Sequence, residues 1–288
     1  MIDALLTTDG QRLHLQRWPA LGPSRGTVQI VHGLGEHTGR YAHVVAALNS
    51  AGWHAAGHDL RGHGRSTGPR GGLPDGHTLL ADVALVHDHL RDTHPGGTRI
   101  LLGHSLGGLI ASRFVAESLL GMPAPWSRPL DGLVLSSPAL DPGMNAVQQL
   151  LLTVLGPIAP RLALSNGLKP EWISRDAAVV KAYVDDPLVH DRVTPRLVRF
   201  IVDAGAAVQR HAVRWQTPTL LLWAGADRCV APAGSAAFAA AAPQSVLTAQ
   251  VYPDLAHEIF NEPERDQVLA RLTGWLERYP LPLSEERP

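Results

Sequence analysis

The sequence predicts an α/β protein with a mostly parallel central sheet, helices on both faces and a helical cap insertion. Short apolar stretches that suit strands alternate with segments whose apolar residues recur at helical spacing. A Gly-x-Ser-x-Gly sequence at 103–107 stands where one such strand gives way to a helix. Residues 141–215 interrupt the alternation and contain no clear strand. Because strands separated by helices of this length tend to pair in parallel, these observations favour a sheet covered on both sides.

The first half of the chain is expected to open with a hairpin and then to alternate. Leu5–Thr8 and Leu13–Trp18 flank the turn-forming pair Asp9-Gly10. Further strands are expected at Thr27–Val31, Trp53–His58 and 98–102. Helices are expected at Tyr41–Ala51, Leu79–Leu90 and 106–120.

The second half is expected to return to the sheet after a long insertion. After a strand at Leu133–Ser137, residues 141–215 are expected to form three or four helices, as a cap on a core made of 1–140 and 216–288. Strand, helix, strand and helix then follow at Thr219–Trp223, Ala233–Ala241, Val246–Tyr252 and Val268–Tyr279. Within the cap, the apolar stretch Met144–Pro160 suits the interior of the cap, or else an entrance for lipid-like substrates or a contact with a membrane surface.

Composition excludes several classes of protein. The 288 residues are enough for a full-sized core, and the 25 basic and 26 acidic residues nearly cancel. No global field therefore favours nucleic acid or an anionic membrane. The single cysteine, Cys229, cannot form an internal disulfide, which suits a reducing compartment. No signal peptide is visible, and no apolar stretch reaches the roughly 18 residues that span a bilayer, so a cytoplasmic protein is expected.

Ser105, at the centre of the Gly-x-Ser-x-Gly sequence, is the candidate nucleophile. A serine at such a junction sits on a sharp, strained turn that pushes its Oγ out of the sheet. Gly103 and Gly107 flank it because a side chain would clash where the turn tightens. The following helix points its free N–H groups and the positive end of its dipole at whatever binds there.

Three strand ends carry a candidate nucleophile, acid and base. In an open parallel sheet the reactive loops lie beyond the C-terminal ends of the strands. Ser105, Asp227 and His257 follow three of these ends, in the order expected when a Gly-x-Ser-x-Gly turn heads a triad. His257 would take the serine proton, and Asp227 would hold the imidazole tautomer. Asp254 and Glu258 compete for the role of the acid, but their closeness to His257 in sequence suits loop residues.

The loop after the strand at Thr27–Val31 completes the candidate site. An oxyanion needs two preorganised amides, and the backbone N–H of Leu106, directly after the nucleophile, is one. The N–H of Leu34 is the expected second, because the neighbouring glycines let this backbone approach a substrate. Four neighbours of these residues are candidates to line the site: His32, Gly33, His104 and Cys229. For Cys229 the favoured interpretation is a small buried hydrophobe, and a thiol near the site is the alternative.

Two other interpretations of these loops remain open. Gly33-Leu34-Gly35, followed by a helix, a strand and Asp59, imitates a dinucleotide-binding fingerprint but leaves the three strand-end residues unexplained. His54, His58 and His63 could suggest a metal site, although no second cluster of ligands accompanies them. We therefore expect neither a metal nor a cofactor.

Six motifs along the chain carry a resemblance to one family. They are His32–His37 with Arg40-Tyr41, Asp59–Ser66, Gly103–Gly108, Asp186–Val189, Gly225–Asp227 and His257–Glu262. On these motifs nearly the whole chain resembles the α/β-hydrolase superfamily, and within it the monoacylglycerol lipase and lysophospholipase-like serine hydrolases.

The resemblance implies an α/β-hydrolase fold and a cytoplasmic or membrane-peripheral carboxylic ester hydrolase. It implies a triad of Ser105, Asp227 and His257, the Leu34 and Leu106 amides as the oxyanion hole, and no metal or cofactor. The cap would form an amphipathic entrance for a single acyl chain and could touch a membrane or micelle surface transiently. The predicted reaction is hydrolysis of monoacylglycerols or similar small single-chain esters through an acyl-enzyme.

Three alternative functions stay open at this point. The same machinery could act on a thioester, a peptide, or an aromatic or synthetic ester. An oxidoreductase would instead use the look-alike fingerprint between Gly33 and Asp59, and a binding protein would leave the triad unused. Epoxide hydrolase and dehalogenase chemistry is disfavoured, because those relatives place an aspartate where this chain has Ser105.

Overall fold

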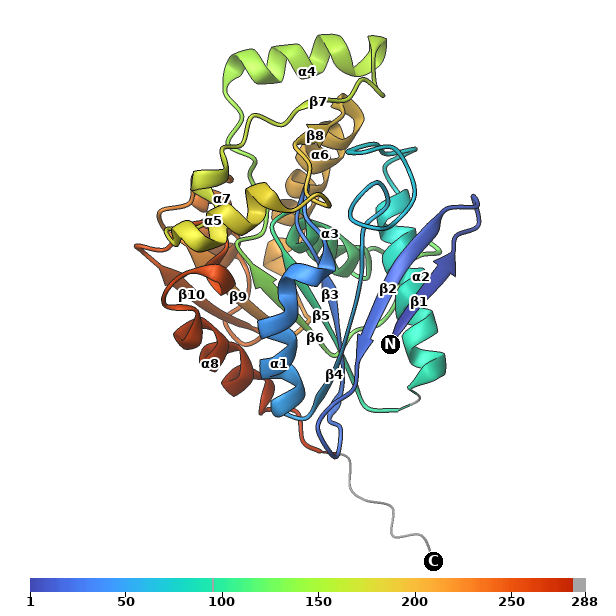
Figure 1. Ribbon diagram of the computed structural model, residues 1–288, viewed down its shortest axis with the longest axis vertical. Helices are drawn as coiled ribbons and strands as arrows, with labels where there is room; N and C mark the ends of the chain where they lie inside the picture. The colour runs from blue at the N-terminus through green and yellow to red at the C-terminus, as the bar shows by residue number, and fades with distance from the viewer. Residues whose placement is uncertain (95, 282–288) are drawn as a thin grey trace, which may run out of the picture.

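An eight-stranded sheet forms the centre of the computed structural model, which describes residues 1–94 and 96–281 (Figure 1). Its strands lie in the order β1-β2-β4-β3-β5-β6-β9-β10. Their bounds are β1 Ile2–Leu6, β2 Arg12–Trp18, β3 Gly26–Val31, β4 Trp53–His58, β5 Thr98–His104, β6 Gly132–Ser136, β9 Thr219–Ala224 and β10 Leu247–Tyr252. Strand β2 runs antiparallel to both of its neighbours, and every pair from β4 to β10 is parallel. The predicted fold class is confirmed.

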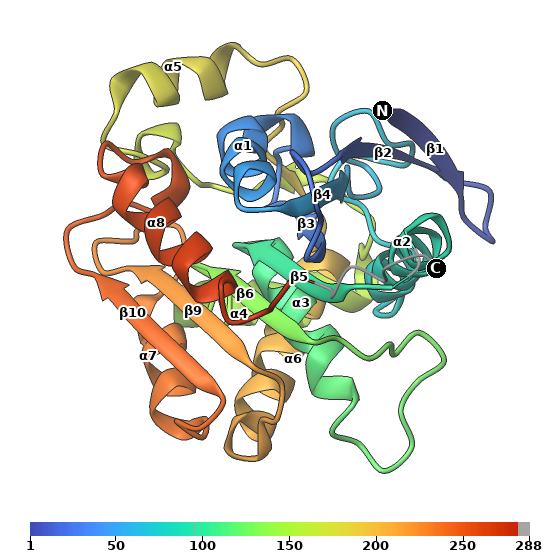
Figure 2. The same ribbon diagram turned by 90° about the horizontal axis from the view of Figure 1, so that it is seen from below.

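Helices cover both faces of this sheet, as Figures 1 and 2 show. On one face lie α1 (Ala42–Ser50) and α8 (Arg265–Leu276). On the other lie α2 (Thr78–Thr93), α3 (Leu106–Glu117), α6 (Pro195–His211) and α7 (Pro232–Ala241). The middle of strand β5 is continuously apolar because helices cover both of its faces. Leu101 faces the α3 side, Ile100 and Leu102 face the α8 side, and all three are buried.

The strands and helices predicted outside 141–215 are all present, with bounds that differ by a few residues. The largest difference in the first hairpin concerns its first strand, which was expected at Leu5–Thr8 but ends at Leu6. The connecting turn is longer than Asp9-Gly10, because the N–H of Thr7 donates to the carbonyl of Gln11 (2.8 Å) and closes a wider loop. The Asp9 carboxylate in that loop binds Arg61, which holds the loop against the core.

The segment predicted as a cap contains helices α4 (Ala146–Ile158) and α5 (Ala177–Asp185) above the C-terminal ends of the strands (Figure 1). The expectation of no strand there is wrong, since β7 (Leu164–Ser165) pairs antiparallel with β8 (Arg192–Val193). Strands of two residues are too short to show an alternating pattern. The remaining elements of the described chain are short 3-10 turns at Thr38–Tyr41, Pro170–Trp172, Ala212–Arg214 and Ile259–Asn261.

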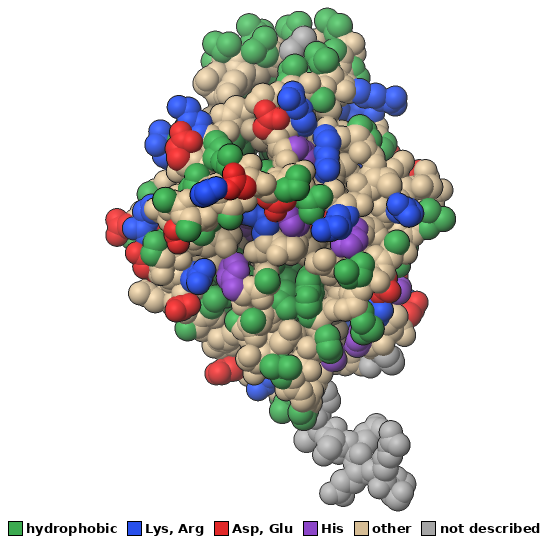
Figure 3. Space-filling view, viewed as in Figure 1, with side chains coloured by type: hydrophobic (Ala, Val, Ile, Leu, Met, Phe, Trp, Pro, Cys, Tyr) green, Lys and Arg blue, Asp and Glu red, His purple; other side chains and the backbone are tan. Residues whose placement is uncertain are grey.

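Helix α6 lies at the end of the predicted cap but packs on the core. Its Leu197, Phe200 and Val208 belong to the same buried cluster as Ile110 of α3. The predicted insertion 141–215 therefore includes a helix that takes part in the packing of the core. Its outermost element is α4, where apolar side chains gather at the top of the surface in Figure 3. None of the described helices combines the length and apolar character needed to cross a bilayer.

Candidate active site

Ser105 lies on the strained turn between β5 and α3. Its backbone adopts φ 53° and ψ −120°, a region that side chains rarely occupy. The flanking glycines make the turn feasible: a Cβ on Gly103 would lie 2.3 Å from the Gly107 carbonyl oxygen, and one on Gly107 would lie 2.0 Å from the Val31 carbonyl oxygen. The chain therefore needs glycine at both positions to present the serine at the helix N-terminus.

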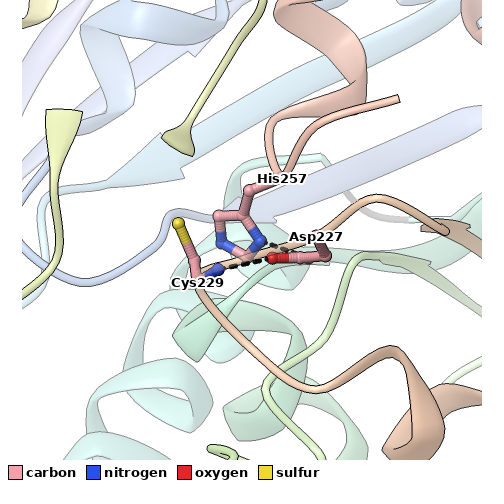
Figure 4. A group of neighbouring side chains, drawn as sticks. All are labelled: Asp227, Cys229 and His257. Atoms are coloured by element: carbon pink, nitrogen blue, oxygen red, sulfur yellow. Dashed lines mark hydrogen bonds and ion pairs between the residues drawn. The ribbon is translucent and has the colours of Figure 1, made fainter. Parts of the chain in front are cut away.

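A continuous hydrogen-bond chain joins the three strand-end residues. The Ser105 hydroxyl lies 2.8 Å from Nε2 of His257, and Nδ1 of His257 lies 2.6 Å from Oδ2 of Asp227. Because the carboxylate accepts only, Nδ1 carries the proton and Nε2 is left to accept from the serine. The second oxygen of Asp227 accepts from the backbone N–H groups of Cys229 and Val230, which fixes the carboxylate (Figure 4).

The site sets opposite pKa shifts on two neighbouring histidines. Burial lowers the pKa of His257, but the charge and hydrogen bond of Asp227 outweigh it, so the pKa of His257 is raised overall. His104, whose ring centroid lies 4.8 Å from that of His257, has its pKa lowered to about 4 by burial and by the neighbouring imidazole. One histidine is therefore suited to take up a proton, and the other stays neutral beside it.

The backbone N–H groups of Leu34 and Leu106 are the two candidate oxyanion donors. Within the described chain, neither the N–H of Leu34 nor that of Leu106 donates to a protein acceptor. Gly33, directly before Leu34, passes so close that a Cβ on it would lie 3.2 Å from Cβ of Ser105. Both N–H groups are therefore available beside Ser105.

His32 does not line the site, contrary to expectation, because it is completely buried beneath the loop. Its Nε2 accepts from the N–H of Leu60 (2.8 Å), so its Nδ1–H donates to the carbonyl of Gly33 (2.8 Å). Since a trans peptide is planar, the bond to that carbonyl directs the N–H of Leu34 the opposite way. His32 thus sets the plane of the candidate oxyanion peptide.

A cavity of about 340 Å³ opens beside Ser105, between the core and the cap. Gly33, His104 and Cys229 line it, with His257. Its apolar wall consists of Leu34, Leu168, Pro170, Ile173, Val184 and Val189. Its polar wall includes Glu36, Glu258, Asn166, Lys169, Asp186, His190 and Asp191. A lining that combines an apolar wall with a polar one suits a small molecule that has an apolar chain and a polar end.

The cap closes this cavity through bonds to the loop that carries the candidate oxyanion amide. Nε2 of His37 lies 2.8 Å from a carboxylate oxygen of Asp186, and the N–H of His190 donates to the carbonyl of Gly35 (2.8 Å). Sequence reasoning missed these contacts, although the motifs that contain His37 and Asp186 were both singled out. The contacts link residues far apart in the chain, which no local pattern reveals.

One group of described residues has the side chains of a metal site. The potential ligand atoms of Asp227, Cys229 and His257 all lie within 4.8 Å of one another (Figure 4). However, the carboxylate and the imidazole already bond each other, and Nε2 bonds Ser105. Burial, followed by the charge of Asp227, raises the pKa of the Cys229 thiol, which disfavours the thiolate that a metal ion requires. The donors therefore fit a triad better than a resident ion.

The other sequence interpretations find no matching geometry. Asp59, the expected ribose ligand of a dinucleotide site, accepts from the N–H and hydroxyl of Thr38 and from the N–H of Arg65. His54 accepts from the N–H of Ala20, while His58 is buried with no partner for either ring nitrogen in the described chain. Asp254 is exposed, and Glu258 binds Arg40, so neither competes with Asp227.

Comparisons with known proteins agree with this geometry. Residues 22–264 match the family model described as "Serine aminopeptidase, S33". The chain is 35% identical over 270 residues to a monoacylglycerol lipase of Mycolicibacterium smegmatis, covering 93% of each. It is 30% identical to the monoglyceride lipase of Homo sapiens, covering 94% of this chain and 89% of that one. The crystal structure of a monoacylglycerol lipase from Paleococcus ferrophilus superposes with a TM-score of 0.80 at 35% identity, covering 93% and 99%.

Proposed function

The chain belongs to the serine aminopeptidase S33 family of α/β-hydrolases, and from this premise we propose that it hydrolyses monoacylglycerols or similar esters with one acyl chain. It is a carboxylic ester hydrolase. The observation that carries the proposal is the hydrogen-bonded chain from Ser105 through His257 to Asp227, whose first two members line a cavity with one apolar and one polar wall. The names of the relatives from Mycolicibacterium smegmatis and Homo sapiens, monoacylglycerol lipase and monoglyceride lipase, agree with this substrate class.

The geometry supports a reaction in two halves. Ser105 attacks the ester carbonyl as Nε2 of His257 takes its proton, and the carbonyl oxygen receives the N–H groups of Leu34 and Leu106. His257 then donates the proton to the leaving alcohol, which leaves an acyl group on Ser105. In the second half, water gives a proton to His257 as it attacks the acyl carbon; the bond to Oγ then breaks, His257 returns the proton to Ser105, and the carboxylic acid leaves. The carboxylate of Asp227 balances the imidazolium in both halves.

The polar wall of the cavity favours an uncharged headgroup over the ammonium group of a peptide. An aminopeptidase needs a free carboxylate to receive that ammonium group. Among the described residues, each carboxylate that lines the cavity has a partner: Glu36 and Glu258 bind Arg40, Asp186 binds His37, and Asp191 binds Arg192. Hydroxyl groups of a glycerol can share these acceptors without displacing their partners.

The outer face of α4 supports a transient contact with a lipid surface. Val147, Leu150, Leu151, Val154 and Ile158 recur at helical spacing and are each about half exposed or more. Leu152, on the opposite side of the helix, is buried. A single apolar stripe turned away from the protein suits the interface of a micelle or membrane, where acyl glycerols reside.

A panel of substrates tests this function directly. Monoolein, p-nitrophenyl esters of increasing chain length, acyl thioesters and aminoacyl anilides are compared at equal enzyme concentration, with Ser105→Ala as the blank. We expect monoolein and long-chain esters to be hydrolysed with the highest kcat/KM. Faster cleavage of the anilides, or turnover that survives Ser105→Ala, would refute the assignment.

A further inference from the structure

Arg40 is a nearly buried cation that connects two loops of the site. It belongs to the 3-10 turn Thr38–Tyr41, and its side chain is 11% exposed. Its Nη1 donates to Glu36 (2.7 Å) and, with Nη2, grips both oxygens of Glu258 at 2.6 Å. Its guanidinium also stacks over the ring of Tyr183 in α5, 4.8 Å from the centroid.

Glu36 connects Arg40 to the loop of the candidate oxyanion hole. Its other oxygen accepts from the N–H of Gly33 (2.6 Å) and from the hydroxyl of Tyr41 (2.7 Å). Burial alone would raise the pKa of this carboxyl, but the charge of Arg40 and its other partners hold the pKa at about 2. The carboxylate is therefore charged and fixed at neutral pH, and it fixes the His32–Gly33 peptide, one residue before the peptide that carries the Leu34 N–H.

Glu258 connects Arg40 to the loop of the candidate base. It directly follows His257, and its own N–H donates to the carbonyl of Ile173 in the cap (2.8 Å). Nδ2 of Asn261 donates to one of the oxygens that Arg40 holds. The planar, five-donor guanidinium matches two carboxylates at once, which a lysine ammonium does not.

From these contacts we propose that Arg40 is a positioning residue that holds the oxyanion loop and the His257 loop at the separation the reaction needs, acting through Glu36 and Glu258. The proposal rests on the function proposed above. Arg40 touches neither Ser105 nor the reacting atoms; it keeps the Leu34 amide and Nε2 of His257 in register around the serine. Misplacement by about 1 Å of such groups is expected to lower kcat by about 10²-fold.

Arg40→Lys is the first test, because it keeps the buried positive charge and removes the planar guanidinium that bonds both carboxylates. We expect kcat per active site, counted by fluorophosphonate titration, to fall by about 10- to 100-fold while KM changes little. The matched control is Arg128→Lys, which breaks a bidentate pair with Asp88 far from the site and should leave kcat per titrated site unchanged. A purely structural Arg40 would lower the titrated fraction and the melting temperature but not kcat per site, and that result overturns the proposal.

A double-mutant cycle provides a second test that does not require Arg40 to change. Glu36→Gln and Glu258→Gln each weaken one of the two ion pairs of Arg40, so each should lower kcat per titrated site. If both variants lower kcat through the same Arg40 contacts, the double variant should be about as slow as the slower single variant. Effects on kcat that multiply independently contradict the proposal. Failure of the wild-type protein to label or to hydrolyse esters would instead contradict the proposed function.

Discussion

The catalytic end of the sheet and the outer cap differ in how their residues are held. Ser105 and His257 are at most 9% exposed, and each is fixed by hydrogen bonds to other strand ends. Helix α4 has no ion pair in the described chain, and most of its apolar stripe faces outward. The candidate site is therefore buried and held by hydrogen bonds, whereas α4 presents an exposed apolar surface without ion pairs in the described chain.

The largest effect is expected from removing the nucleophile. Ser105→Ala deletes the atom that forms the acyl-enzyme, so kcat for ester hydrolysis should fall by about 10⁶-fold. Since alanine fits the space of serine, thermal unfolding should stay close to that of the wild type. Hydrolysis at more than about a hundredth of the wild-type rate would place the chemistry elsewhere.

The next largest effect is expected from the acid. Asp227→Asn keeps the shape but removes the charge that holds the imidazole tautomer, and kcat should fall by about 10⁴-fold. The raised pKa of His257 depends on that carboxylate, so the acid limb of the profile of kcat/KM against pH should move to lower pH in the variant. An unchanged acid limb would show that His257 is not the titrating base.

The sequence predicts the core of the fold better than the segment between β6 and β9. The ends of β5 and β9 were predictable because buried parallel strands are continuous apolar runs, and Ser105 and Asp227 lie in the loops that follow them. His257 lies in the loop after β10, a partly exposed edge strand with a weaker apolar signal. The division into core and cap stays a prediction, and α6 packs on the core although it falls within 141–215. Its apolar face alone does not say which partner it covers, so tertiary packing decides.

Contacts between distant segments could not be predicted from the sequence. His32 was expected to line the site, but its hydrogen bond to Leu60 places it beneath the loop, where it orients the Gly33–Leu34 peptide. The motif that contains Arg40 was recognised, yet no spacing rule connects it to Glu258, 218 positions later. Such side-chain bonds depend on how loops meet after folding.

A smaller, substrate-dependent effect is expected in the cap. Leu150→Ser with Leu151→Ser makes the exposed stripe of α4 polar, so kcat/KM for monoolein in micelles or vesicles should fall by about tenfold. Hydrolysis of a soluble short-chain p-nitrophenyl ester should not change. Met122→Ser, at a 90% exposed site outside the cap, is the control and should affect neither substrate. Equal losses on both substrates would show a general defect instead of lost surface contact.

The smallest effect is expected from a buried histidine that takes no part in the reaction. Burial lowers the pKa of His58 to about 3, so the folded protein keeps it neutral while the unfolded chain protonates it below about pH 6.5. Stability is therefore lost as pH falls from about 6.5 toward 3. In His58→Leu, the free energy of unfolding measured in urea should depend less steeply on pH across this range, by the equivalent of up to one proton. The kcat per titrated site should not change. An identical pH slope would mean that His58 is protonated equally in both states.

Labelling by a fluorophosphonate tests the central claim most directly, because only a serine activated by its base and oxyanion donors reacts rapidly with this probe. The modified peptide is identified by mass spectrometry, and the rate is measured for the wild type and for Asp227→Asn. The geometry predicts one label per chain on Ser105, formed far more slowly in Asp227→Asn. Absence of labelling, or a label on another serine, would contradict the account.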